Sequence, residues 1–520
     1  MTSQETSDLL SDTDYLAFVA RALDEVNDAE KSQRKLQERK RHGEAAILDS
    51  LAYLAVCKPE KQVVATAALL RKEDAGLRIL VAENGEATEG VVEHLQNVLK
   101  LLALIREQAE PFLPEGSRSP RVQRWIADDS PIPYEQSLIN LEVLVIRHSW
   151  KKLGQRSTKD CRHANAIDTA NDVCNPDALN SVDSTLRSCL QQVQAVTEAE
   201  RKKISAMPVA LEALAWTLDV ETPNDAEVKR VRKLLMQLDN FRTTFEAKGD
   251  FLQNWNNYTR LQLISEGKTV RKRPDLIRWL SKLTSNRRHY HRLADITISN
   301  TLSATLLANH PVVVSVQNPL PRPRPFTVDD HQMGVILKGA ECKIEPELGV
   351  VRGFIEKLAK LRNRPVTDGQ LTFEGPAPVH CECKLLAAIH SRTAIQYIGV
   401  SKPPCALCDI YFEAYRQATN THIKFTSGSR SRTSPWTCPQ VGEPVLLDST
   451  IEERVRSQLL RKINRGWDLF IRAFLSSSQS TDASEDNTGL WFGTDYDAEA
   501  AADEIITEMQ ALPQRVIRRG

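Results

Sequence analysis

The sequence predicts an α/β protein that is rich in helix, and three observations carry this prediction. Apolar residues recur at three- and four-residue spacing along most of the 520 residues, as amphipathic helices require. Short β-prone runs at 63–82, 312–316 and 396–400 interrupt this helical pattern. Histidine, glutamate and cysteine residues gather on either side of the last run, which indicates where the chemistry lies.

The composition is that of a globular protein with balanced charge. Lys and Arg number 68, as do Asp and Glu, so the formal net charge is zero, and 41% of the residues are hydrophobic. These values exclude a chain that is disordered throughout, a collagen and a polybasic nucleic-acid coat. Any contact with nucleic acid must therefore come from a local basic patch.

The first residues, the length of the apolar runs and the placement of the cysteines all favour an intracellular protein. The first residues are polar and acidic, and the longest apolar runs fall far short of the ~18 residues of a membrane span. We therefore expect an intracellular protein of the cytoplasm or nucleus, with no membrane partner. Five of the ten cysteines lie between 381 and 438. In a reducing compartment such clustering indicates a metal site rather than a disulfide framework.

The N-terminal part is expected to begin with helices and continue into a hairpin. We expect a helical segment over 1–42, and we interpret its charged stretch 31–41 as a solvated helix face. Residues 43–87 should form a helix followed by a β-hairpin, because two β-prone runs flank the turn at 74–76.

Residues 88–370 are expected to form a mainly helical insertion. This segment has no clustered metal ligands, Gly-rich phosphate loop or nucleophile-base pattern, so we expect it to shape access or to bind a protein partner. Its most basic stretch, 269–292, has eight Lys and Arg residues with Trp279 and Tyr290 interleaved. Such a stretch can hold phosphates and stack bases. The alternative, which we favour, is an amphipathic helix at 275–283 with an ordinary charged face.

The chemistry-bearing motif is H-x-E followed, after a gap, by P-C-x-x-C. Cys405 and Cys408 can place two thiolates on one zinc ion from the first turn of a helix, and His380 can supply a third ligand from another helix. Three protein ligands leave a fourth position for water, whose pKa zinc lowers toward neutrality. Glu382 then needs only to reach that water, take its proton and pass it to a departing amino group.

The stretches VHCECKLL and YIGVSKPPCALC resemble the zinc signature of the cytidine deaminase-like superfamily, and within it a branch of predicted deaminases abundant in filamentous fungi. The resemblance implies an α/β three-layer fold, a mixed sheet flanked by helices, which the helical insertion would interrupt. It implies a zinc-dependent hydrolytic deaminase of a cytosine- or adenine-type base, either free or in single-stranded nucleic acid. His380, Cys405 and Cys408 match the zinc ligands and Glu382 matches the proton shuttle, whereas Cys381 stands where the superfamily usually has Ala.

The same resemblance implies three substrate contacts. Asn84 ends the second hairpin strand, where the superfamily often has an Asn that touches the substrate; Pro404 precedes Cys405, and Trp436 follows an expected fourth strand at 422–426. The zinc-binding core then spans 371–445. A C-terminal helix follows at 446–475, and a flexible tail with a last helix occupies 476–520.

Three alternatives remain open from the sequence. The hairpin could belong to a separate N-terminal domain, with Asn84 as a turn residue. A structural zinc knot could use Cys381, Cys383, Cys405 and Cys408, which would make the motif an interaction module and leave His380 and Glu382 without a role. The fold could also be an inactive scaffold, although the intact Glu382 argues against this.

Overall fold

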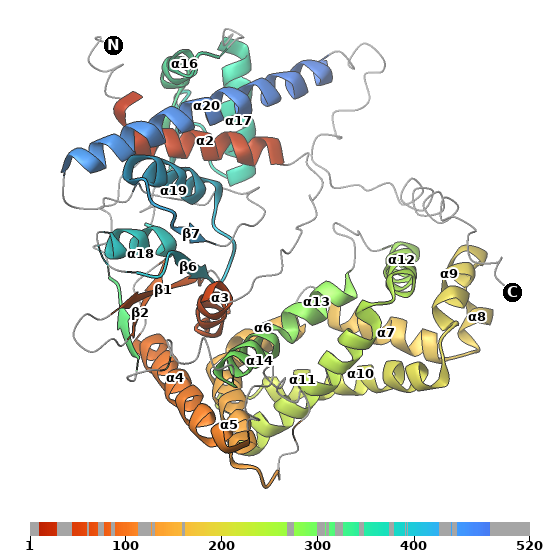
Figure 1. Ribbon diagram of the computed structural model, residues 1–520. Helices are drawn as coiled ribbons and strands as arrows, with labels where there is room; N and C mark the ends of the chain where they lie inside the picture. Colours follow the sequence, from red (N-terminus) through yellow and green to blue (C-terminus); the bar gives the residue numbers. More distant parts are fainter. Residues whose placement is uncertain are drawn as a thin grey trace, which may run out of the picture. The chain divides into compact units, whose positions relative to one another are not determined.

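The computed structural model contains two compact units (Figure 1), and each is described by itself. The first unit comprises 1–56, 61–141 and 289–483, and the second comprises 57–60, 142–288 and 484–520. The residues that the structure describes are 10–28, 44–59, 62–70, 77–84, 89–112, 126, 130–158, 162–267, 275–298, 307, 311–317, 326–342, 348–373, 379–390, 392, 394–425, 438 and 445–478. Within these ranges, none of the helices combines the length and apolar character needed to traverse a lipid bilayer.

A mixed five-stranded sheet lies at the centre of the first unit. Its strand order is β3-β2-β1-β6-β7, with parallel pairs at β2·β3 and β6·β7 and antiparallel pairs at β1·β2 and β1·β6. The strands are β1 (Val64–Leu70), β2 (Leu77–Glu83), β3 (Val312–Ser315), β6 (Tyr397–Val400) and β7 (Lys424–Phe425). A separate two-stranded sheet pairs β4 (Phe326–Val328) with β5 (Leu371–Phe373).

The predicted hairpin is part of the same sheet as the motif strand. Strands β1 and β2 pair over their whole length, and Ala65 and Thr66 of β1 pair with Val400 and Gly399 of β6. This pairing excludes the alternative in which the hairpin belongs to a separate domain. The described residues 64–69 of β1 are all buried, so both faces of this central strand are covered.

Helix α3 (Glu44–Leu54) covers one set of side chains of β1 and β6. The Thr66 hydroxyl donates a hydrogen bond to the Leu48 carbonyl at 2.8 Å, and the Asp49 carboxylate accepts from Tyr397 Oη and the Val400 N–H. The helix approaches so closely that a Cβ on Gly399 would lie 2.2 Å from the Leu48 carbonyl carbon. Glycine is therefore required at this point of β6.

The motif helices complete the first unit. Helix α18 (Cys381–Ile389) packs on β1, β2 and β6, and α19 (Ala406–Thr419) packs on the long helix α20 (Val445–Ser478). Helix α20 also packs along α2 (Thr13–Asp28), and Trp467 contributes its fully buried ring to the same core. The remaining helices of this unit are α4 (Glu89–Ala109), η1 (Glu110–Phe112), α16 (Asp330–Gly339) and α17 (Leu348–Arg362).

The second unit is helical and has its own core. Its helices are α6 (Trp150–Thr158), α7 (Arg162–Cys174), α8 (Ala178–Ser181), α9 (Ser184–Gln194), α10 (Glu198–Leu218), α11 (Asp225–Glu246), α12 (Gly249–Ser265) and α13 (Leu276–Leu283). Capping boxes begin α10 at Thr197 and α11 at Asn224. The core contains fully buried Trp255, Tyr258 and Phe245.

Two helices, α5 (Pro133–His148) and α14 (Ser285–Ile298), run across the boundaries of the units. In the second unit a buried ion-pair network joins Glu142 of α5 to Arg232 of α11, at 2.7 Å, and to Arg287 of α14. The helices expected over 88–370 thus fall into both units, and only 142–288 forms a compact body of its own. The expected domain boundaries stay predictions.

Candidate metal centre

The three predicted ligands lie at the starts of two helices. His380 is the N-cap residue of α18, with extended backbone angles, and Cys405 is the N-cap residue of α19. Cys408 follows in the first turn of α19, so both thiols point from one helix start toward His380. Pro403 and Pro404 directly precede the N-cap residue, where their fixed φ restricts the chain that leads into the helix.

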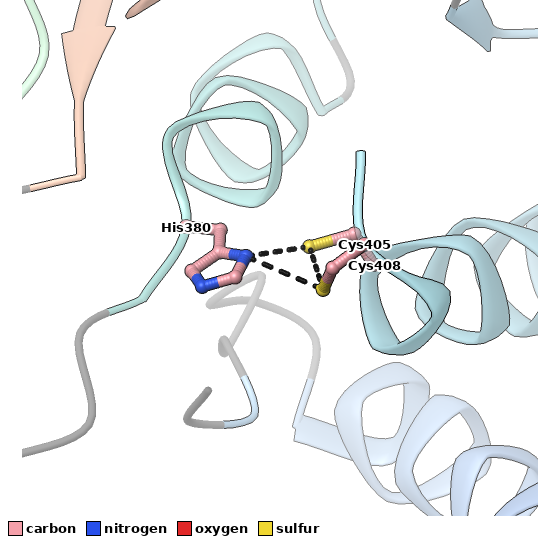
Figure 2. A group of neighbouring side chains, drawn as sticks. All are labelled: His380, Cys405 and Cys408. Carbon is pink, nitrogen blue, oxygen red and sulfur yellow. Dashed lines mark hydrogen bonds between the residues drawn. The ribbon is translucent and has the colours of Figure 1, made fainter. Parts of the chain in front are cut away.

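The ligand atoms converge (Figure 2). His380 Nδ1 lies 3.1 Å from Cys408 Sγ and 3.5 Å from Cys405 Sγ, and the two sulfur atoms are 3.6 Å apart. With Zn–N near 2.0–2.1 Å and Zn–S near 2.3 Å, ligand atoms of a tetrahedral zinc site lie about 3.5–3.8 Å apart. The donor set and two of its three separations fit zinc, and the third is slightly shorter. All three side chains are buried.

The two thiols differ in their electrostatics. Hydrogen bonding with Cys408 and the neighbouring His380 lower the pKa of the Cys405 thiol from 9.0 to about 4, against the opposing effect of burial. Burial raises the pKa of Cys408 well above 9.0. One thiolate is therefore already available near neutral pH, whereas Cys408 must lose its proton when a metal binds.

Glu382 lies in the same helix turn as His380. It is the second residue of α18 and is only 3% exposed. The Cys381 thiol donates a hydrogen bond to Glu382 Oε2 at 3.2 Å. Burial, together with the Glu382 carboxylate, raises the pKa of this thiol, so it stays protonated and keeps donating. The Cys that replaces the usual Ala thus contacts the carboxylate itself.

The arrangement does not favour a four-cysteine knot. The group of ligand atoms that lie within 4.8 Å of one another contains His380, Cys405 and Cys408, and neither Cys381 nor Cys383 belongs to it. The Cys381 thiol is instead turned to Glu382. The group among the described residues is therefore the one that leaves a coordination position open.

Of the three predicted substrate contacts, the structure describes Asn84 and Pro404. Asn84 lies beside the start of α18, where its Oδ1 accepts a hydrogen bond from the Cys381 N–H at 2.9 Å. Pro404 is buried next to Cys405. Trp436 lies outside the described residues. The fourth strand expected near 422–426 is present as β7, paired with β6. The substrate-binding roles stay predictions.

Sequence analysis missed a buried pair of charged residues beside the site. Lys384 of α18 is 5% exposed and Glu83, the last residue of β2, is 3% exposed. Lys384 Nζ donates a hydrogen bond to the Glu83 carbonyl at 2.8 Å, and Gln62 Nε2 donates to Glu83 Oε2 at 2.8 Å. The signal in the sequence was a second charged residue, beside Glu382, in the short and mostly apolar helix CECKLLAAI. Lysine and glutamate are seldom fully buried without partners, so the sequence pattern alone gave no reason to expect either side chain in the interior.

Comparison with known proteins identifies the class to which this site belongs. Residues 379–440, which contain all three ligands and Glu382, match the model of the family described as OTT_1508-like deaminase. The match confirms, over this segment, the resemblance to the cytidine deaminase-like superfamily. The helix-rich chain with its mixed five-stranded sheet is consistent with an α/β deaminase-like fold. Neither the curated proteins nor the solved structures include a match to this chain.

Proposed function

We propose that the protein is a zinc-dependent hydrolytic deaminase that acts on an amino-substituted base of the cytosine or adenine type. The observation that carries the proposal is the buried His380, Cys405 and Cys408 group, with Glu382 in the same helix turn as its histidine. The sheet with α3 and α18 would be the three-layer fold of the superfamily, interrupted by helices that shape access to the site or bind a protein partner.

Each residue of the site would have its own role in the reaction, as a metal ligand, a proton carrier or a contact to the base. His380, Cys405 and Cys408 would hold zinc, which lowers the pKa of a water molecule so that hydroxide is available as the nucleophile. The C–N bond to the exocyclic amino group breaks, the water oxygen becomes the carbonyl oxygen of the product, and ammonia leaves. Glu382 takes one proton from the water and returns it to the departing nitrogen, while the second water proton ends on the ring nitrogen beside the new carbonyl group. Asn84, Pro404 and Trp436 would orient the base.

The decisive experiment compares the wild type with Glu382→Gln across free nucleosides and nucleotides, single-stranded DNA and RNA. The Gln side chain has nearly the same shape as Glu, so the variant should keep about one zinc per chain, measured by metal analysis. Its ammonia release should fall by ~10²–10⁴-fold, because a positioned proton shuttle is lost. Glu453→Gln, an exposed glutamate of α20, is the matched control. Ammonia release that is unchanged in Glu382→Gln would refute the mechanism.

Metal binding tests the ligand set independently of turnover. Cys405→Ala should lose zinc, because two protein ligands hold the ion far more weakly than three, whereas Cys381→Ala should retain it. Metal analysis of the two purified variants checks both statements. If Cys405→Ala retained stoichiometric zinc and Cys381→Ala lost it, the cysteine knot would be the better description.

A base in single-stranded nucleic acid is the substrate class that we propose over a free nucleoside. The basic stretch 269–292 gives this proposal little support, because Arg287, Trp279 and Tyr290 are 2%, 3% and 4% exposed. Arg287 pairs with Glu142, and the Trp279 indole donates to the Arg156 carbonyl. The stretch forms the amphipathic helix α13 followed by α14, as favoured from the sequence; residues 271–273 lie outside the described residues.

Helix α20 offers the better surface for a strand. Four exposed arginines lie at spacings of 7, 4 and 7 residues, which places them within about 20° of one line along the helix, over about 27 Å. The partners that the structure records for them are neutral side chains, Gln417 and Ser457. Guanidinium groups in such a row can contact successive phosphates. The four are Arg454, Arg461, Arg465 and Arg472, named here the arginine row.

A further inference from the structure

The end of strand β2 holds the start of helix α18 at two points. Asn84 Oδ1 accepts the Cys381 N–H at 2.9 Å, and the Glu83 carbonyl accepts from Lys384 Nζ at 2.8 Å. Cys381 directly precedes Glu382 and Lys384 is the second residue after it. Two consecutive residues, the last one of β2 and the one that follows it, therefore hold the helix on both sides of the carboxylate.

The strand end is itself fixed. The Asn84 N–H donates to the carbonyl of Val63, the residue that directly precedes β1, at 3.2 Å. Gln62, from the same stretch, donates to the Glu83 carboxylate. The start of α18, and with it Glu382, is thus tied to the central sheet.

The chemistry of the contacts suits positioning rather than simple packing. The first N–H groups of a helix have no partner within the helix, so the Asn84 amide oxygen serves as a cap contributed by a distant strand. A buried lysine is costly unless its ammonium group is paired, and an apolar side chain would fill the same space at lower cost. A lysine at 384 is explained if its hydrogen bond to β2 serves the neighbouring Glu382.

We propose that Glu83 and Asn84, through Lys384 and Cys381, are positioning residues that fix the orientation of the Glu382 carboxylate. The inference rests on the proposed function, because it assigns the carboxylate a task that depends on its exact direction. It also gives Asn84 a role that differs from the substrate contact expected from the sequence.

The variants are Lys384→Met and Asn84→Ala, which remove one donor and one acceptor, and Asn84→Asp, which retains the acceptor and removes the amide donor. Lys424→Met, an exposed lysine of β7, is the control. Removing a group that orients a catalytic side chain typically costs about 10–100-fold. We expect kcat to fall by that factor in Lys384→Met and Asn84→Ala, with KM and zinc content unchanged, and to stay near the wild-type value in Lys424→Met.

A second measurement needs no substrate. Amide hydrogen exchange over 381–384, followed by mass spectrometry, should become about tenfold faster or more in Lys384→Met and Asn84→Ala, and should remain as in the wild type in Asn84→Asp. Exchange elsewhere in the sheet should not change. Wild-type exchange at the helix start of both variants, or acceleration spread over the whole first unit, would overturn the proposal.

Turnover in a Glu382→Gln background separates positioning from other roles. If β2 acts through Glu382, Lys384→Met and Asn84→Ala should leave the residual rate of that variant unchanged. An equal loss in both backgrounds, a raised KM with unchanged kcat, or loss of zinc would each overturn the proposal, since they indicate a structural, substrate-binding or His380-positioning role. If the wild type turns over no base, the proposed function fails, whereas the exchange result still decides whether β2 holds the helix.

Discussion

At the scale of single residues, Gly399 shows how little space separates α3 from the sheet. Its ideal Cβ would lie 2.4 Å from the Leu48 carbonyl oxygen and 2.5 Å from the Asp49 nitrogen, and these are backbone atoms that cannot rotate away. Gly399→Ala should therefore lower the free energy of unfolding of the first unit by about 3 kcal/mol, as overpacking of a core does. Denaturant unfolding measures this loss.

The matched control for Gly399→Ala is Gly90→Ala. A Cβ at Gly90 in α4 has no atom within 4 Å, and alanine is the better helix former, so this variant should be unchanged or slightly more stable. Equal stability of the two variants would show that α3 does not approach β6 as closely as the structure has it.

The residues of the metal group could be predicted from the sequence because their geometry is local. The spacing of Cys405 and Cys408 and the placement of His380 and Glu382 are set by one helix turn each, so the motif carries most of the geometry. The contacts of Lys384 could not be predicted. Its partner lies 301 residues earlier in the chain, and the packing of α18 on β1 and β2 brings the two together.

At the scale of elements, the periodicity of apolar residues predicts a helix or strand whose pattern lies within one segment. It does not predict burial that depends on contacts with other segments. The hairpin, α3 and α20 were expected from local patterns and are present. The pattern of 269–292 favoured the amphipathic helix that is present as α13, but it could not show that Arg287 is buried, because that depends on Glu142 of another helix. The small β4·β5 sheet was not foreseen, because its three-residue strands carry too few residues to show a period.

The arginine row of α20 gives the element-scale prediction. Replacing its four arginines with glutamine removes about four phosphate contacts, so binding of single-stranded nucleic acid should weaken. The slope of the logarithm of affinity against the logarithm of salt concentration should become shallower by about 3. Fluorescence anisotropy over a salt series measures both quantities.

The control for the arginine row makes the same change in charge on the second unit. It replaces four exposed cations of α9 and α11 with glutamine, Arg187, Lys229, Arg230 and Lys233. An unaltered slope in the arginine-row variant would remove α20 from nucleic-acid binding. Absence of strand binding by the wild type at low salt would instead favour a small-molecule substrate.

At the scale of the whole molecule, the two units have separate hydrophobic cores. Trp255 is fully buried in the core of the second unit and Trp467 in that of the first. Each Trp→Ala variant should lose about 3–5 kcal/mol of stability in its own unit, because a large cavity remains. Scanning calorimetry should show Trp255→Ala lowering one transition and Trp467→Ala the other.

Zinc content provides the second readout for these variants, because all three ligands belong to the first unit. Trp255→Ala should keep its zinc up to the temperature at which the wild type loses it, whereas Trp467→Ala should release it earlier. Loss of zinc at a lower temperature in Trp255→Ala would contradict the independence of the two cores.

The pairing of the hairpin with β6 also determines when the sheet can be completed during synthesis on the ribosome. Along the chain 337 residues separate Val64 from Ser401, whose side chain accepts the Val64 N–H at the edge where the strands meet. Ribosomes add about 5–20 residues per second, so a nascent hairpin waits on the order of 20–70 s before β6 emerges. During that interval one edge of β1 has no neighbour, and open strand edges invite pairing with other chains. The nascent protein should therefore depend on chaperones most strongly during this interval, before the cysteines of the metal centre have been translated.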